Sequence, residues 1–241
     1  MSHSYKTIYN WPVERQRRFY TWCYWDNAFN DEELDKIEDM LGKEELERGT
    51  TIGEKPADKA NTENSSVEVA KTGSSNSGGV IVSQQPNEKA RKSDVKFINF
   101  ENYQGPYDFI FDRLNHVVES INNQYYNFDI NGYESFQYTV YHDYEEGKYD
   151  WHQDTIMGGH IPNDMYETRK LSITFLVNDP EKDFEGGQFQ INTGQEKDAE
   201  SVPFKRGRII VFPSFMIHRV APVTKGIRKS IVVWVMGPKF R

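Results

Sequence analysis

The stretch KLSITFLV, from Lys170 to Val177, determines the fold that we expect, because large apolar side chains alternate in it with smaller ones. The large apolar residues of the stretch are Leu171, Ile173, Phe175 and Val177. The intervening positions include two small hydroxyl residues, Ser172 and Thr174. Side chains alternate between the two faces of a β-strand. We therefore expect one face of this strand to pack under a helix and the other to look into a barrel.

Short runs of the same kind follow one another from Glu134 onward, separated by glycine, proline, asparagine and aspartate. Besides 170–177, the predicted strands are 135–141, 149–154, 187–192, 200–204, 208–213, 218–223 and 229–236. Many short strands with such turn residues between them are typical of a barrel or a double-sheet jelly roll. The predicted fold is therefore mainly β, with a jelly-roll core and flanking helices.

Two amphipathic helices are predicted before this region. The first, NDEELDKIEDMLG at 30–42, begins with Asn30 as a candidate N-cap and has Glu33 three residues later, as in a capping box. The second, DFIFDRLNHVVESINN at 108–123, carries apolar residues at helical spacing. We expect both helices to pack against the outside of the barrel rather than to carry function.

A tract at 50–96 contains no aromatic residue and is rich in polar residues. Such a composition buries too little apolar surface to offset the entropy of ordering, which predicts a mobile insertion. Two short β-prone runs, VEVAKT at 67–72 and GVIVSQ at 79–84, also fit a hairpin, and both interpretations are open. The predicted organisation is one domain over 1–241: strand and helix support at 1–49, the insertion at 50–96, and the catalytic core at 134–237.

The composition limits the classes of function. With 29 Lys and Arg against 37 Asp and Glu, the net charge is −8, which disfavours nucleic acid as a partner. A single cysteine, Cys23, excludes an internal disulfide and fits a reducing compartment. No apolar run has membrane-spanning length, so no membrane partner is expected. We expect a soluble cytoplasmic protein, taken as a monomer because nothing indicates an oligomer.

Three residues are candidate metal ligands. His152 and Asp154 lie two positions apart in DWHQDT at 150–155, so their side chains share a strand face. Such a pair alone is more often a surface or hydrogen-bonded core feature, but His218, on another predicted strand, offers a third ligand. Two histidines and one carboxylate leave adjacent coordination positions open, which suits Fe(II). A structural zinc site would need four ligands and favour cysteine.

Arg228 is the candidate anion-binding residue. It shares a strand face with Ser230 and Trp234, and an inward-facing arginine requires an anionic partner. A guanidinium beside a hydroxyl suits the remote carboxylate of a bidentate ligand, although an internal salt bridge is the alternative. Thr174, favoured over Ser172, and Tyr138 on the first barrel strand are predicted to line the same pocket. Pocket wall and core packing are both open interpretations for Tyr149, Trp151 and Trp234.

These residues resemble the Fe(II)- and 2-oxoglutarate-dependent dioxygenases of the prolyl 4-hydroxylase type, which include the "PKHD-type" hydroxylases. The resemblance covers Tyr138 to Gly237 and lies in three segments taken in order. They are YEEGKYDWHQD at 144–154, RKLSITFLVNDPEKDFEGGQF at 169–189 and FPSFMIHRVAPVTKGIRKSIVVWV at 212–235. The last contains H-x-V-x-P-V-x-x-G-x-R, and the order and spacing are far more specific than H-x-D.

The resemblance implies a double-stranded β-helix with His152, Asp154 and His218 as catalytic iron ligands and Arg228 as the residue that binds 2-oxoglutarate. It implies Fe(II), 2-oxoglutarate and O₂ as cofactors, with ascorbate as an optional addition, and a prolyl residue of a peptide or protein as the substrate. Succinate and CO₂ would be co-products. The alternatives are the same chemistry on a free amino acid, another small molecule or an alkylated base, and a non-catalytic metal-binding barrel. A cupin-like metal protein without 2-oxoglutarate is disfavoured by Arg228 and Ser230.

Overall fold

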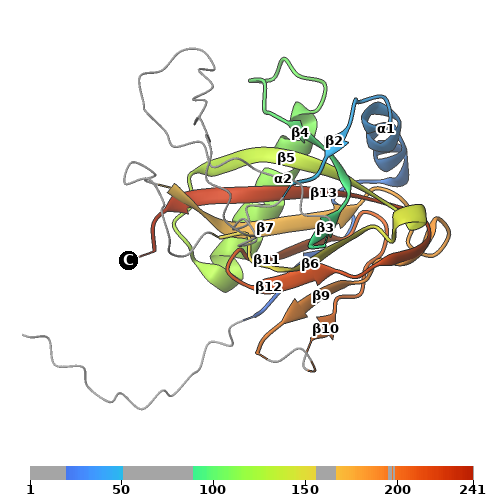
Figure 1. Ribbon diagram of the computed structural model, residues 1–241. Coiled ribbons are helices and arrows are strands. Elements are labelled where there is room, and N and C mark those ends of the chain that lie inside the picture. The colour runs from blue at the N-terminus through green and yellow to red at the C-terminus, as the bar shows by residue number, and fades with distance from the viewer. Residues whose placement is uncertain (1–19, 51–88, 156–166, 195–196, 198, 241) are drawn as a thin grey trace, which may run out of the picture.

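A computed structural model describes residues 20–50, 89–155, 167–194, 197 and 199–240 (Figure 1). The two helices are α1 (Asp31–Leu41) and α2 (Asp108–Ile121), and a π-helical turn at Asn122–Tyr126 follows α2. The strands are β1 (Cys23–Trp25), β2 (Glu47–Arg48), β3 (Arg91–Lys92), β4 (Asp94–Ile98), β5 (Gly132–His142), β6 (Lys148–His152), β7 (Glu167–Leu176), β8 (Phe184–Gly186), β9 (Phe189–Asn192), β10 (Glu200–Ser201), β11 (Ile209–Pro213), β12 (Ile217–Val220) and β13 (Val223–Pro238). No helix within these described ranges has the length and apolar character needed to cross a membrane.

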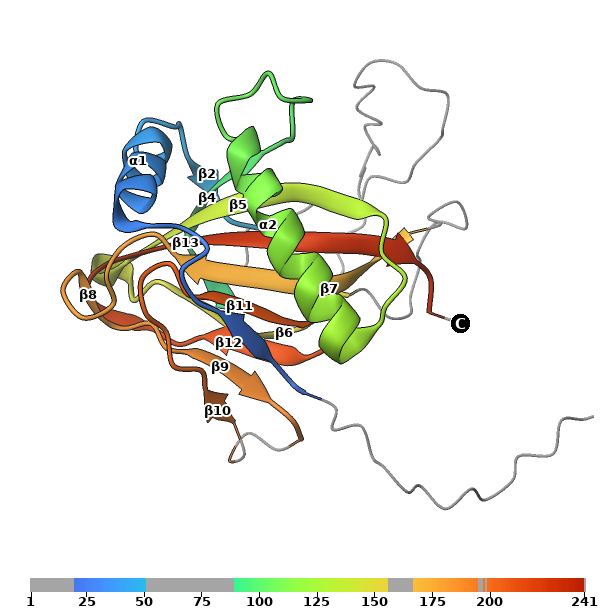
Figure 2. The ribbon, with the colours of Figure 1, turned by 180° about the vertical axis from the view of Figure 1, so that it is seen from behind.

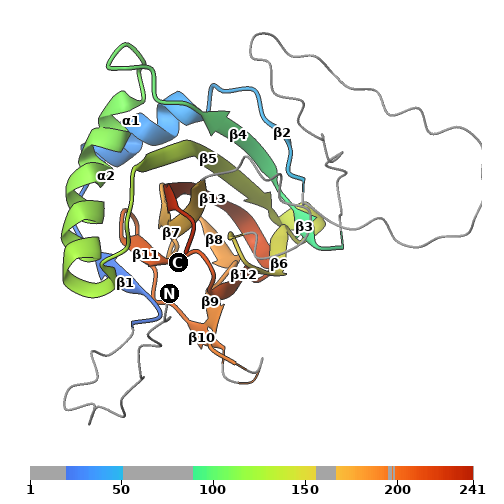
Figure 3. The same ribbon diagram turned by 90° about the vertical axis from the view of Figure 1, so that its left-hand side faces the viewer.

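The strands form two antiparallel sheets that face each other (Figure 3). The larger sheet has the order β1-β11-β7-β13-β5-β4-β2, with β8 pairing to β13 at its side. The smaller sheet has the order β10-β9-β12-β6-β3. Two facing antiparallel sheets whose neighbours are distant in sequence make a jelly roll. The predicted fold class, a mainly β protein with a double-stranded β-helix core and flanking helices, is confirmed.

Both helices cover the outer face of the larger sheet (Figure 2). Helix α1 begins at the predicted capping box, in which the Asn30 side chain accepts from the Glu33 N–H at 2.8 Å and the Glu33 carboxylate accepts from the Asn30 N–H at 3.0 Å. The apolar stripes of α1 and α2 pack with residues of β5, β7, β11 and β13 in one buried cluster. The helices therefore support the sheet from outside, as the sequence predicts.

A second buried cluster fills the space between the sheets. Its members from the larger sheet include Leu176, Ile210 and Phe212, and those from the smaller sheet include Phe189 and Ile191. Because the side chains of one strand alternate between faces, the same β7 contributes to this inner cluster and to the outer one. The inner cluster closes one part of the barrel, and the rest is the cavity described below.

Three features differ from the predicted organisation or lie outside it. The predicted hairpin at 67–84 falls outside the described residues. The predicted insertion extends too far, because Arg91–Lys92 and Asp94–Ile98 are strands of the two sheets. The last strand is also longer than predicted, since β13 starts at Val223 and pairs with β5 on one side and β7 on the other.

Candidate active site

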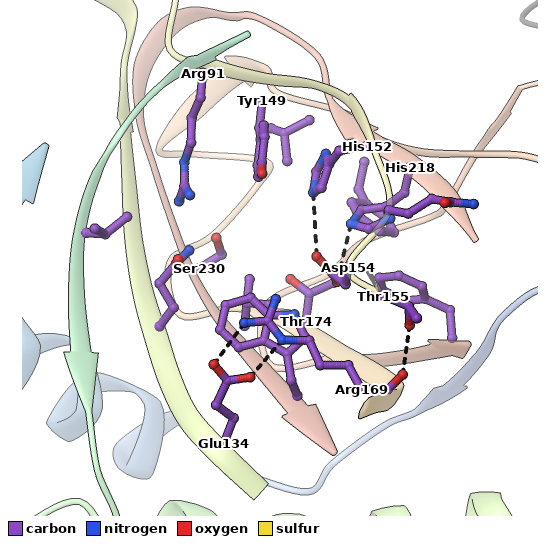
Figure 4. Close-up of a pocket in the computed structure, with 18 of the residues that line it drawn as sticks. Arg91, Glu134, Tyr149, His152, Asp154, Thr155, Arg169, Thr174, His218 and Ser230 are labelled. Carbon is purple, nitrogen blue, oxygen red and sulfur yellow. Dashed lines mark hydrogen bonds and ion pairs between the residues drawn. The ribbon is translucent and has the colours of Figure 1, made fainter. Parts of the chain in front are cut away.

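His152, Asp154 and His218 come together at the inner face of the smaller sheet (Figure 4). His152 ends β6 and lies directly opposite His218 of β12 in the strand register, and Asp154 follows β6 by two residues. The Nε2 of His152 lies 3.7 Å from Asp154 Oδ1, and the Nε2 of His218 lies 3.6 Å from Asp154 Oδ2. One ligand atom from each residue falls within 4.8 Å of the others, which is the spacing of a metal-binding group.

Backbone carbonyls fix the tautomer of both histidines. The Nδ1 of His152 lies 2.7 Å from the Asp150 carbonyl oxygen, and the Nδ1 of His218 lies 2.9 Å from the Met216 carbonyl oxygen. A carbonyl oxygen only accepts, so each Nδ1 carries the proton and each Nε2 keeps its lone pair. Both lone pairs belong to the atoms nearest Asp154, which is what metal coordination requires.

Aromatic packing desolvates the histidines. The Tyr149 ring stacks on His152 at 3.5 Å between centroids, and the Phe212 ring lies 4.7 Å from that of His218. Burial, and next the nearby His218, lower the pKa of His152 to about 3, so its imidazole is neutral at pH 7. Burial raises the pKa of the Asp154 carboxyl, but the neighbouring His218, His152 and Arg169 side chains and the Ser172 hydroxyl together lower it by more, so the pKa lies below its usual value and the carboxyl is ionised.

Arg228 lies on the inner face of β13 and is 1% exposed. Its Nε donates to the Gly187 carbonyl at 3.1 Å, and its Nη1 donates to the Ser230 hydroxyl at 2.8 Å. No carboxylate within the described parts of the chain forms an ion pair with it, so the alternative of an internal salt bridge is not borne out there. Burial lowers the pKa of Arg228 to about 10, which still leaves the guanidinium charged at pH 7.

Gly187 makes room for this arginine. Its φ is +62°, and a Cβ at this position would lie 2.9 Å from Arg228 Cδ. Only glycine adopts this conformation at little cost and also leaves the space free. Gly187, the second residue of the Gly-Gly pair, therefore permits the close approach of the Arg228 side chain to the backbone.

One cavity of about 890 Å³ connects the three ligand candidates with Arg228 and Ser230. Thr174 lines it as predicted, and so do Tyr149, Trp151 and Trp234. These three aromatic residues are therefore part of the pocket wall. Ser172 is fully buried and donates to the Asp154 carboxylate at 2.6 Å.

The prediction that Tyr138 lines this pocket is wrong. Tyr138 is 1% exposed and belongs to the outer cluster beneath the helices, together with Phe136 and Val140, which lie on the same face of β5. The pocket is lined instead by residues on the opposite face of β5, namely Gln137 and Tyr141. Both faces of this strand are buried and both carry aromatic side chains, so alternation alone does not say which face is the inner one.

Sequence reasoning missed several charged residues of the cavity, among them Arg91, Glu134 and Arg169. Arg169 forms a two-point ion pair with Glu134, at 2.7 and 2.9 Å, and its guanidinium lies 3.7 Å from the centroid of the Trp234 ring. Arg91 lies 4.6 Å above the Tyr149 ring. No sequence pattern indicates Arg91, because its strand is only two residues long and lies in a different sheet from the next strand, β4.

The donor set fits a ferrous ion. Two imidazole nitrogens and one carboxylate oxygen make a 2-His-1-carboxylate set, which leaves positions free for other ligands and suits non-haem Fe(II). A buried, charged Arg228 with a neighbouring hydroxyl fits the far carboxylate of 2-oxoglutarate. A jelly roll with such a set facing a cavity of this size defines the class, a β-barrel with a candidate metal site.

The comparisons with known proteins show what part of the chain resembles a known family. Residues 136–236 match the family model "2OG-Fe(II) oxygenase superfamily". A "PKHD-type hydroxylase" of Synechococcus sp. (strain JA-2-3B'a(2-13)) is 37% identical over 67 residues. That alignment covers 28% of this chain and 29% of the relative's length, so the chain aligns with under a third of that curated relative. The segment 136–236 is therefore similar to the 2OG-Fe(II) oxygenase superfamily.

Solved structures agree on the fold. A Pseudomonas putida prolyl-4-hydroxylase superposes with a TM-score of 0.57 at 16% identity, covering 89% of this chain and 92% of that one. A Trichoplax adhaerens prolyl hydroxylase in complex with a hypoxia inducible factor peptide fragment gives a TM-score of 0.60 at 14% identity, covering 90% and 84%. At these identities the similarity establishes the shared jelly roll.

Proposed function

We propose that this protein is an Fe(II)- and 2-oxoglutarate-dependent dioxygenase that hydroxylates a prolyl residue of a peptide or protein. The observation that carries the proposal is one cavity containing the open His152, Asp154 and His218 set together with the charged, buried Arg228. His152, Asp154 and His218 would hold Fe(II), and Arg228 with Ser230 would hold 2-oxoglutarate. When bound, iron with 2-oxoglutarate and O₂ supplies the oxidation that converts a C–H bond into C–OH and 2-oxoglutarate into succinate and CO₂.

The protein's own part in this chemistry is binding and orientation. In the Nδ1–H tautomer the Nε2 atoms of His152 and His218 are free to coordinate, and the Asp154 carboxylate is ionised. Arg228 keeps three of its five N–H groups after its bonds to Gly187 and Ser230, enough for a two-point contact with a carboxylate. The rings around His152 and His218 exclude water from the metal side of the cavity.

Two buried donors support a peptide as the substrate. Within the described residues, Arg91 Nη2 and Trp234 Nε1 are the buried side-chain nitrogens that lack a hydrogen-bond partner. Both residues line the cavity, Arg91 from the smaller sheet and Trp234 from the larger one. A buried donor without an acceptor is costly, and a ligand with carbonyl oxygens on two sides would satisfy both once the side chains that cover these atoms move aside. A polypeptide main chain offers such oxygens, and the indole of Trp234 offers an apolar wall for a proline ring.

The test uses purified protein with Fe(II), ascorbate and 2-oxoglutarate. Peptides that contain proline should stimulate succinate release and gain one oxygen atom by mass spectrometry, whereas matched peptides with alanine for proline should not. EDTA should abolish the release. Stimulation by free amino acids or nucleobases but by no peptide would replace the prolyl assignment, and an absence of metal-dependent succinate in every arm would refute the oxygenase itself.

A further inference from the structure

Two serine hydroxyls form a chain that ends on the Asp154 carboxylate. Ser172 Oγ donates to Asp154 Oδ2 at 2.6 Å and lies 2.9 Å from Ser214 Oγ. Both serines are fully buried, in β7 and directly after β11 respectively. Buried hydroxyls of this kind need partners, and these two find them in each other and in the carboxylate.

The direction of this hydrogen-bond chain follows from the number of protons that each group can donate. An ionised carboxylate only accepts, so Ser172 gives its single hydroxyl proton to Asp154. The contact between the two hydroxyls therefore has Ser214 as its donor and Ser172 as its acceptor. The order is Ser214 to Ser172 to Asp154, and each hydroxyl fixes the rotamer of the next side chain.

The backbone of Ser214 also binds the backbone of Asp154 and Thr155. Its carbonyl accepts from the N–H groups of Asp154 at 2.9 Å and Thr155 at 3.0 Å, and its own N–H donates to the Lys170 carbonyl at 3.0 Å. Ser214 is thus tied to β7 and to the residues that follow β6. Side chain and main chain of Ser214 act on Asp154 together, the first through Ser172 and the second directly.

We infer that Ser172 and Ser214 are positioning residues that keep the Asp154 carboxylate a one-oxygen ligand. This inference rests on the proposed function, because it takes the three ligand candidates as the iron site. In the described part of the chain, Oδ2 accepts the Ser172 proton, and Oδ1 accepts no hydrogen bond, which leaves Oδ1 for a metal. A carboxylate that coordinated through both oxygens would occupy a position that 2-oxoglutarate and O₂ need on an octahedral ion.

The experiment measures the affinity for Mn(II) alone by calorimetry. Loss of an outer hydrogen-bond partner costs roughly 10- to 100-fold in metal affinity, so Ser172→Ala should weaken Mn(II) binding at least about tenfold. Ser172→Thr, which keeps a hydroxyl, should stay near the wild-type affinity. Ser214→Ala should cause a smaller loss, and adding it to Ser172→Ala should cause no further loss, because both act through one chain.

Tyr126→Phe is the matched control, since it removes a buried hydroxyl that contacts the Val211 carbonyl in the outer cluster beneath the helices. It should change the unfolding temperature and leave Mn(II) affinity unaltered. Under anaerobic conditions, Ser172→Ala should also alter the absorption band that forms when 2-oxoglutarate joins the Fe(II) protein. A purely packing role for Ser172 would move neither the affinity nor this band.

The inference is overturned if Ser172→Ala binds Mn(II) as tightly as the wild type, or if Ser172→Thr loses as much affinity as Ser172→Ala. If Ser172→Thr does not fold, the Mn(II) affinities of Ser214→Ala and Tyr126→Phe are compared instead. Equal Mn(II) affinities of these two variants overturn the inference. Failure of the wild type to bind Mn(II) would instead count against the proposed function. Normal binding and turnover in the wild type with an unaffected Ser172→Ala would count against this inference alone.

Discussion

Replacing Arg228 with glutamine isolates the part of the site that is expected to select 2-oxoglutarate. Arg228 is buried and charged, and its three remaining N–H groups allow two charge-assisted hydrogen bonds to a carboxylate. Such bonds contribute roughly 1.5–3 kcal/mol each, so losing both costs about 3 kcal/mol or more. We expect the Kd of Arg228→Gln for 2-oxoglutarate to rise by at least about 100-fold.

The assay is calorimetric titration of 2-oxoglutarate into the Mn(II)-loaded protein, with 2-oxopentanoate as the matched ligand that lacks the far carboxylate. The substitution should leave the affinity for 2-oxopentanoate nearly unchanged, because that ligand makes no charge pair with residue 228. A thermal unfolding curve checks that the variant is folded. The reasoning is refuted if the affinity for 2-oxoglutarate falls by less than about threefold, or if both ligands lose affinity by the same factor.

Three further predictions test the rest of the molecule. His152→Ala should abolish Mn(II) binding, measured by calorimetry, because one of three ligand atoms is lost; retained affinity would contradict the ligand assignment. Leu114→Ala, in the fully buried stripe of α2, should lower the free energy of unfolding by about 2–5 kcal/mol without changing Mn(II) affinity, and a changed affinity would show that α2 does more than support the sheet. Asp26 has its pKa lowered by its hydrogen bonds to Arg208, so the stabilisation it gives is present at neutral pH and is lost as the pH falls through that lowered value. Asp26→Asn should therefore cost up to about 1 kcal/mol at pH 7 and nothing in strong acid, measured by urea unfolding; a difference that does not depend on pH would refute the link.

The parity of strand residues could be predicted where one face is clearly polar. On β7, the hydroxyl residues Ser172 and Thr174 face inward and the large apolar residues face the helices, as the alternation indicates. On β13, Arg228 and Ser230 share the inner face with Trp234. In both strands the polar face lines the barrel interior and the apolar face packs under the helices. An alternation of period two is therefore enough to predict which side chains point inward.

The alternation of residues did not identify which face of β5 lines the cavity. It also did not show that strands before Glu134 contribute residues to the cavity. In β5, Tyr138 and Tyr141 are of the same residue type and lie on opposite buried faces, so residue type does not tell the inner face from the outer one. The strand β3 has no apolar residue and follows a long polar tract, which hides Arg91 in a segment whose composition predicts mobility. The places of β3 and β4 in the sheets depend on pairing with β6 and β5, which are remote in sequence.

The two halves of the candidate site differ in how their geometry is fixed. His152 and His218 lie opposite each other on hydrogen-bonded strands, so the sheet ladder itself sets their separation. Arg228 belongs to the other sheet, and its distance from the histidines is set by the residues between the sheets, among them Phe212, whose ring also contacts His218. A motif such as H-x-D with a later histidine therefore predicts that the two histidines lie close together. The separation of Arg228 from the two histidines depends on how the whole interior packs. The distance that a ligand must bridge between the two sheets can therefore be seen only in the folded structure.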